Sequence, residues 1–142
     1  FNGAEVDIAA DLVTERLSKG LRSGYHFILA ERGSGLVAYA CYGPIEGTQG
    51  SFDLFWIAVA LEEQHKGLGP QVFARAENAM RKAGAKKIYV DTSSSDRYAP
   101  TRGFYQRMGF EEDARLPDFY GPGDAKVIYV KSLDGGAAPP PH

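Results

Sequence analysis

The stretch Gln64-His65-Lys66-Gly67-Leu68-Gly69 constrains the fold most, because of the segments on either side of it. Residues 52–59 before it are rich in aromatic and branched side chains, which is typical of a strand. After it, apolar residues recur at the spacing of one helix face: Val72, Phe73, Ala76, Met80 and Ala83. The sequence therefore predicts a strand, a glycine turn and a helix in succession.

Such a turn suits a phosphate group. The first amides of a helix have no intrahelical partner, and the helix dipole is positive at this end. The glycines alone do not identify a ligand, because a plain strand-to-helix connection also uses them. No Gly-Lys-Ser/Thr follows, so the Walker pattern is absent. The dinucleotide fingerprint is incomplete, because Val72 stands where its third glycine would be.

The remaining pattern predicts a single domain of helices and strands. It indicates helices over 6–17, 70–83 and 98–108, and strands over 25–31, 36–42, 52–59, 87–91, 110–115 and 126–131. The first three strands should form an antiparallel meander, and residues 117–123 should form an aromatic loop between the last two. We assign residues 1–133 to this domain and expect the Gly/Ala/Pro-rich residues 134–142 to be a disordered tail.

Composition excludes several classes of protein. A net charge of -2 argues against a dedicated nucleic-acid binder. The single cysteine, Cys41, allows no intramolecular disulfide and no cysteine-rich metal site, which suits the cytoplasm. No apolar run is long enough to cross a bilayer, so we expect no membrane partner.

Two motifs carry a family resemblance. The first is Gln-x-x-Gly-x-Gly at 64–69, after an antiparallel strand; the second is Phe104-Tyr105 followed by Gly109-Phe110 at a helix-to-strand junction. Together they resemble the GNAT superfamily of N-acetyltransferases, with matching element order from about 25 to 131. The resemblance implies an α+β fold: a mixed, mostly antiparallel sheet with helices on both faces. It also implies acetyl-CoA (coenzyme A) as co-substrate, no metal, and a homodimer as one oligomeric option.

The resemblance implies the following cofactor-binding residues. The main chain of Ile57, Ala58 and Val59 would pair with the pantetheine arm, and the pyrophosphate would be surrounded by Gln64, Lys66, Gly67, Leu68 and Gly69. Two positions depart from the family pattern. Pro70, expected at the first helical position, has no N–H to offer a phosphate. Tyr98 stands where family members often have an Asn against the cofactor arm, and we expect it to line the pocket.

The resemblance also implies the catalytic residues. Tyr105 would protonate the departing thiolate, since a phenol of pKa about 10 is close to a thiol of about 8.5. We take Phe104 as the buried member of the aromatic pair. Asp53, eleven positions before Gln64, would act as base through a water molecule. Strand alternation predicts that Asp53 shares a face with Phe55, Ile57 and Val59. An ordinary rim position for Asp53 stays open, as do weaker candidate bases: Glu46, His26 and His65.

The predicted function is transfer of an acetyl group from acetyl-CoA to a primary amine, by direct attack in a ternary complex. The acceptor would be a small molecule or a peptide. Two alternatives stay open: a non-catalytic acyl-CoA-binding or regulatory module on the same scaffold, and a nucleotide-binding protein of another class.

Overall fold

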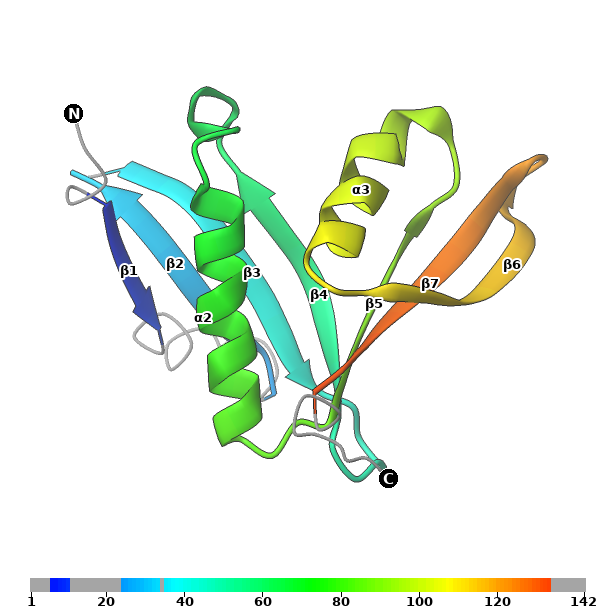
Figure 1. Cartoon of the computed structure of the whole chain (residues 1–142), viewed down its shortest axis with the longest axis horizontal. Coiled ribbons are helices and arrows are strands. Elements are labelled where there is room, and N and C mark those ends of the chain that lie inside the picture. The colour runs from blue at the N-terminus through cyan, green and yellow to red at the C-terminus, as the bar shows by residue number, and fades with distance from the viewer. Residues whose placement is uncertain (1–5, 11–23, 34, 134–142) are drawn as a thin grey trace.

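A computed structural model of the chain describes residues 6–10, 24–33 and 35–133 (Figure 1). Its strands are β1 (Val6–Ala10), β2 (His26–Arg32), β3 (Gly35–Pro44), β4 (Ser51–Val59), β5 (Lys87–Ser93), β6 (Glu111–Gly121) and β7 (Asp124–Ser132). Its helices are the 3-10 turns η2 (Leu61–Glu63) and η3 (Asp96–Tyr98) and the α-helices α2 (Leu68–Lys82) and α3 (Ala99–Arg107).

The strands form one sheet in the order β1-β2-β3-β4-β5-β7-β6. All neighbours are antiparallel except β4 and β5, which run parallel. These two pair only over Ser51–Asp53 of β4 and then separate, so the sheet opens into two arms (Figure 1). The predicted α+β class, with a mixed and mostly antiparallel sheet, is confirmed.

Helices α2 and α3 lie on the same face of the sheet, one over each arm (Figure 1). The apolar face predicted for α2 is buried: Val72, Phe73, Ala76 and Met80 are each at most 3% exposed. They pack with strand residues such as Ile28, Leu54 and Val127 in one core. A helix on the opposite face stays a prediction, because residues 11–23 lie outside the described ranges.

Two element predictions were wrong. Residues 6–10 form strand β1, paired antiparallel with β2, and not the start of a helix. Hydrogen bonding to the edge of β2 overrides the helical spacing there, and the rest of the predicted helix lies outside the described residues. Residues 117–121 continue strand β6 instead of forming a loop, with a register shift between Leu116 and Gly121. The predicted disordered tail, 134–142, also lies outside the described residues.

None of the helices in the described ranges is long and apolar enough to cross a membrane.

Candidate active site

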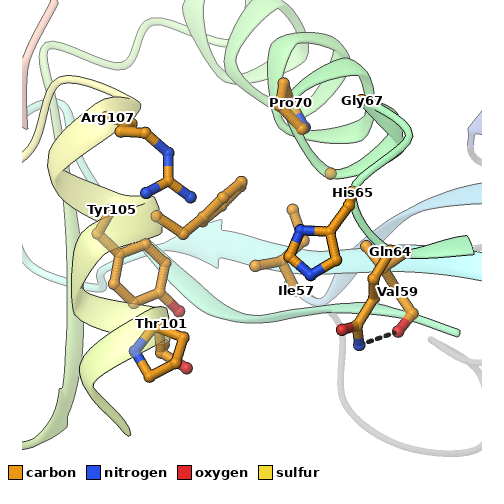
Figure 2. A pocket seen from close by; sticks show the side chains of 12 residues that line it. Ile57, Val59, Gln64, His65, Gly67, Pro70, Thr101, Tyr105 and Arg107 are labelled. Atoms are coloured by element: carbon orange, nitrogen blue, oxygen red, sulfur yellow. Dashed lines mark hydrogen bonds between the residues drawn. The ribbon is translucent and has the colours of Figure 1, made fainter. Parts of the chain in front are cut away.

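A cavity of about 470 Å³ opens between the end of β4, the start of α2 and helix α3 (Figure 2). It is lined by Ile57, Val59, Gln64, His65, Gly67, Gly69, Pro70, Pro100, Thr101, Phe104, Tyr105 and Arg107. The lining joins the two sequence motifs, which are far apart in the chain. A cavity of this size suits a small organic ligand or part of a larger one.

Strand β4 shapes one wall of the cavity through its unpaired edge. Residues Ile57, Ala58 and Val59 pair with β3 on one side, at Ala40, Tyr39 and Ala38. On the other side β5 has already separated, so no described strand pairs with them. The Gln64 side chain takes one group of this segment, donating from Nε2 to the Val59 carbonyl at 3.1 Å (Figure 2). The rest of this edge can pair with an extended ligand, in the manner of an added strand.

The turn before α2 places main-chain amides of the first helical turn beside the cavity. His65 and Gly67 have positive φ angles of 66° and 82°, which bend the chain sharply ahead of the helix. The first helical hydrogen bond runs from Gln71 N to Gly67 O at 3.3 Å, so the amides of Leu68 and Gly69 precede it. Pro70 is the third helical residue, not the first as predicted, because α2 begins at Leu68. It still lies in the first turn, where its missing N–H costs no helical bond.

Gly69 is required for a close approach between α2 and α3. A Cβ atom at this position would lie 3.2 Å from Cε1 of Phe104 and 3.6 Å from Cγ2 of Val59. A side chain here would press on the Phe104 ring and narrow the cavity. The second glycine of the motif therefore serves packing as well as ligand access.

The burial of the aromatic pair on α3 is the reverse of what was predicted. Tyr105 is 5% exposed, whereas Phe104 is half-buried in the cavity wall. The Tyr105 ring packs against Phe110 and Tyr129, with centroids 5.7 and 6.1 Å away. The Tyr105 hydroxyl makes no hydrogen bond to any residue in the described ranges, and the residue lines the cavity. Burial, followed by the charge of Asp91, raises the pKa of Tyr105 to about 12, so the phenol stays protonated at neutral pH.

Helix α3 is fixed at its first turn by Arg102. The Arg102 Nη1 atom donates to the carbonyls of Ser93 and Ser95, each at 2.8 Å. These carbonyls mark the end of β5 and the approach to η3. Since Arg102 lies one turn before Tyr105, this contact fixes the position of the Tyr105 side chain relative to the cavity.

A bulge in β4 places Asp53 on the face opposite to Ile57 and Val59, against the prediction from alternation. Cys41 pairs with Trp56 and Tyr42 pairs with Leu54, so Phe55 is the inserted residue. One extra residue shifts the two-residue period, which moves every later side chain to the other face. Ile57 and Val59 consequently face the cavity and Asp53 does not line it.

Asp53 lies where β4 and β5 begin to separate, paired with Tyr89 of β5. Burial raises the pKa of the Asp53 carboxyl; the charge of Asp91 raises it further and Lys126 partly offsets this. The carboxylate of Asp91, an exposed residue of β5, acts on both Asp53 and Tyr105. Its position at the end of a predicted strand was the only sequence signal that could have indicated it.

The structure brings six of the predicted site residues to the cavity: Ile57, Val59, Gln64, Gly67, Gly69 and Tyr105. The others do not line it: Ala58, Lys66, Leu68, Tyr98 and Asp53. Leu68 can still offer its amide, because its side chain is buried while its N–H lies in the first helical turn. Tyr98 is 39% exposed in η3, with the Arg97 guanidinium 5.8 Å from its ring centre.

The sequence reasoning missed four lining residues: Pro100, Thr101, Phe104 and Arg107. All are on α3, and their contact with the turn at 64–69 depends on how α3 is placed across the opening. Arg107 had one usable signal, a cation in the last turn of a helix beside the second motif. It brings a positive charge to a wall where a phosphate would be held.

No cluster of three or more potential metal ligands occurs among the residues that the structure describes.

The chain matches the family described as "Acetyltransferase (GNAT) domain" over residues 23–112. A curated relative is the blasticidin-S acetyltransferase of Streptomyces morookaense, 39% identical over 82 residues. That match covers 57% of this chain and 55% of the relative, so the chain spans about half the length of this curated relative.

Solved structures with a similar fold also come from the GNAT family. A GNAT-family protein from Desulfovibrio desulfuricans is 35% identical, with a TM-score of 0.83, covering 89% of this chain and 98% of that one. A GNAT acetyltransferase from Elizabethkingia anophelis, with acetyl-CoA bound, has a TM-score of 0.72 over 91% of this chain and 99% of that one. At 15% identity the second likeness concerns the fold alone.

Proposed function

The chain belongs to the GNAT family of acetyltransferases, and we propose that it moves an acetyl group from acetyl-CoA to a primary amine by direct attack. The observation that carries this proposal is the cavity at the opening of the sheet, where the glycine turn and Tyr105 line the same space. The turn offers amides for a pyrophosphate, and the unpaired edge of β4 offers main-chain groups for an amide-bearing arm. The Tyr105 hydroxyl faces no competing protein partner among the described residues.

In this proposal Tyr105 donates its proton to the thiolate as the tetrahedral intermediate collapses. A backbone N–H near the β4 bulge stabilises the oxygen of the thioester carbonyl as it becomes negative. The raised pKa of Tyr105 keeps the proton available at every physiological pH, although it makes the phenol a weaker acid.

Asp53 is proposed as the base, through a water molecule. The register of β4 puts Asp53 on the face opposite to Ile57 and Val59, so in this proposal the base acts from the other side of the sheet opening than Tyr105. Asp91 is the rival base, since its charge acts on both groups. Asp53→Asn and Asp91→Asn separate the two. The variant of the true base loses most of kcat together with the acidic limb of the pH profile, whereas Asp91→Asn, if Asp53 is the base, keeps this limb and only shifts it to lower pH.

Cys41 supports direct attack over a covalent acyl-enzyme. It is fully buried, it does not line the cavity, and burial raises its pKa to about 11. A thiol in this state is a poor nucleophile at neutral pH. Initial-rate plots against both substrates should therefore intersect, whereas parallel lines would indicate an acyl-enzyme.

The acceptor is proposed to be a small molecule that carries an amine. The support is the partial likeness to a blasticidin-S acetyltransferase. A cytoplasmic location and a homodimer stay predictions.

The deciding experiment measures CoA release from acetyl-CoA with a panel of amines that includes blasticidin S, polyamines, amino acids and peptides. Turnover with any of them supports the enzyme, and the panel identifies the acceptor class. Tight CoA binding without turnover across the panel would favour the non-catalytic module, for which Pro70 and Tyr98 are the relevant departures. Stabilisation by ATP or NAD but not by CoA would refute both.

A further inference from the structure

An ion pair outside the cavity holds the turn that leads into the glycine motif. Arg32, the last residue of β2, donates from Nε to Glu63 Oε2 at 3.0 Å and from Nη2 to Glu63 Oε1 at 2.8 Å. Glu63 is the last residue of η2 and directly precedes Gln64. The two side chains are 23% and 9% exposed, so the pair is well shielded from water. A two-bond fork of this kind fixes direction as well as distance.

Little else attaches η2 to the sheet. Leu61 is 81% exposed and Glu62 is exposed, so apolar burial does not hold this turn. The Ala60 N–H donates to Val37 O at 2.8 Å, before the turn, and the Gln64 side chain bonds to Val59 O at 3.1 Å, after it. Within the turn itself, Glu63 is the buried side chain.

We propose that Arg32 and Glu63 are a positioning pair, which aims the amides of residues 67–69 at the pyrophosphate of coenzyme A by anchoring η2 to strand β2. This inference rests on the proposed function. Four residues, 64–67, separate the anchored turn from α2, and two of them have positive φ. A short segment with such restricted angles passes a shift at Glu63 on to the helix start.

Positioning can be told apart from simple charge effects. Arg32 neutralises a carboxylate close to the phosphate site and lowers the pKa of Glu63, so Glu63 stays anionic at neutral pH. If charge alone mattered, Glu63→Gln would leave an extra cation and improve CoA binding, and Arg32→Lys would be neutral. If the fork positions the turn, both substitutions weaken CoA binding, since each breaks the two-bond geometry.

The test compares two acyl donors in purified full-length variants. Acetyl-CoA reaches the glycine turn, whereas S-acetylpantetheine carries the same thioester but no pyrophosphate. For Glu63→Gln and Arg32→Lys we expect kcat/KM with acetyl-CoA to fall about tenfold, the size of losing one charge-assisted bond. With S-acetylpantetheine, kcat/KM should stay unchanged.

The matched control is the Glu112–Arg115 pair on β6, which has the same fork, with both bonds at 3.0 Å, and is exposed. Glu112→Gln and Arg115→Lys should leave kcat/KM unchanged with both donors. Equal losses with both donors would overturn the positioning role and indicate a general structural one. Improved CoA binding in Glu63→Gln would overturn it in favour of charge. A wild-type protein that turns over the two donors equally well would overturn this inference, because the turn would then not hold the pyrophosphate, whereas no turnover with either donor would overturn the proposed function.

Discussion

Replacing Tyr105 with Phe should remove the proposed acid and leave the fold intact. The side chain is 5% exposed, and its ring lies 5.9 Å from Phe104, 5.7 Å from Phe110 and 6.1 Å from Tyr129, measured between centroids. A phenylalanine keeps all three contacts. The hydroxyl has no hydrogen-bond partner among the described residues, so its loss should change the free energy of unfolding by less than about 1 kcal/mol.

The effect on catalysis should be much larger. A positioned general acid contributes about 10² to 10⁴ in rate. Because the pKa of Tyr105 is raised to about 12, it is a weaker acid than a free phenol, and we expect the lower end of that range. A loss of about 100-fold in kcat corresponds to about 2.7 kcal/mol of transition-state stabilisation. The wild-type rate should also show no loss from phenol ionisation up to about pH 11, since ionisation follows the folded pKa.

Three measurements check this: kcat from free-thiol release, the Kd of CoA by calorimetry, and the midpoint of urea unfolding. Only kcat should change. Tyr129→Phe is the matched control, because Tyr129 is a buried tyrosine of the same core that does not line the cavity. An unchanged kcat in Tyr105→Phe would refute the acid role. Parallel losses of CoA affinity and stability would show that the hydroxyl is structural.

Further predictions concern the turn and its surroundings. Gly67→Asp should weaken CoA binding at least about tenfold, because the new carboxylate would repel the phosphates. Gly67→Asn is the neutral control, since Asp and Asn both tolerate the left-handed backbone at this position. Equal CoA affinity in the wild type and both variants would place the phosphates elsewhere. Gly69→Ala should lower the free energy of unfolding, measured in urea, by about 1–2 kcal/mol and should also reduce CoA affinity, because the alanine Cβ would lie 3.2 Å from Phe104. If stability and CoA affinity both stay unchanged, the Phe104 ring moves freely. For Glu77, burial raises the carboxyl pKa, but hydrogen bonds, including one from Lys131 at 2.7 Å, outweigh it and the pKa is lowered. The stabilisation is therefore fully present above about pH 4.5 and is lost as pH falls through the folded pKa. Glu77→Gln should be less stable by about 1 kcal/mol at pH 7, and this difference should shrink as the pH falls below about 4.5.

The parts of the fold that local chemistry determines could be predicted from the sequence. The meander of β2, β3 and β4 follows from short apolar runs separated by turn glycines, and helix α2 from one buried stripe. The helix prediction for residues 6–10 was wrong for a definite reason. Apolar residues at helical spacing form a strand there, because the edge of β2 is available for pairing. Such pairing depends on a distant segment and leaves no local signal.

The site was predictable in its glycine turn but not in its three-dimensional arrangement. The burial of Tyr105 over Phe104 depends on how α3 is tilted, which the bonds from Arg102 to Ser93 and Ser95 set. Those bonds join a helix to main-chain carbonyls, and any residue type could supply such carbonyls. Nothing in the sequence of α3 alone distinguishes the two aromatic residues.

The bulge at Phe55 has the largest consequence for the chemistry. Without it, Ile57 and Val59 would share a face with Asp53 and would turn away from the core side that Phe52 and Leu54 occupy, so the cavity would lose both of these lining side chains. With it, the carboxylate lies on the opposite face while the later residues of β4 still face the cavity. In the proposed mechanism Tyr105, on one side of the opening, protonates the leaving thiolate, and Asp53, on the other side, takes a proton from the attacking amine. The amine then enters from the side that the cofactor leaves free. In the proposed mechanism, a single inserted residue in β4 thereby separates the two sites that a ternary complex would require.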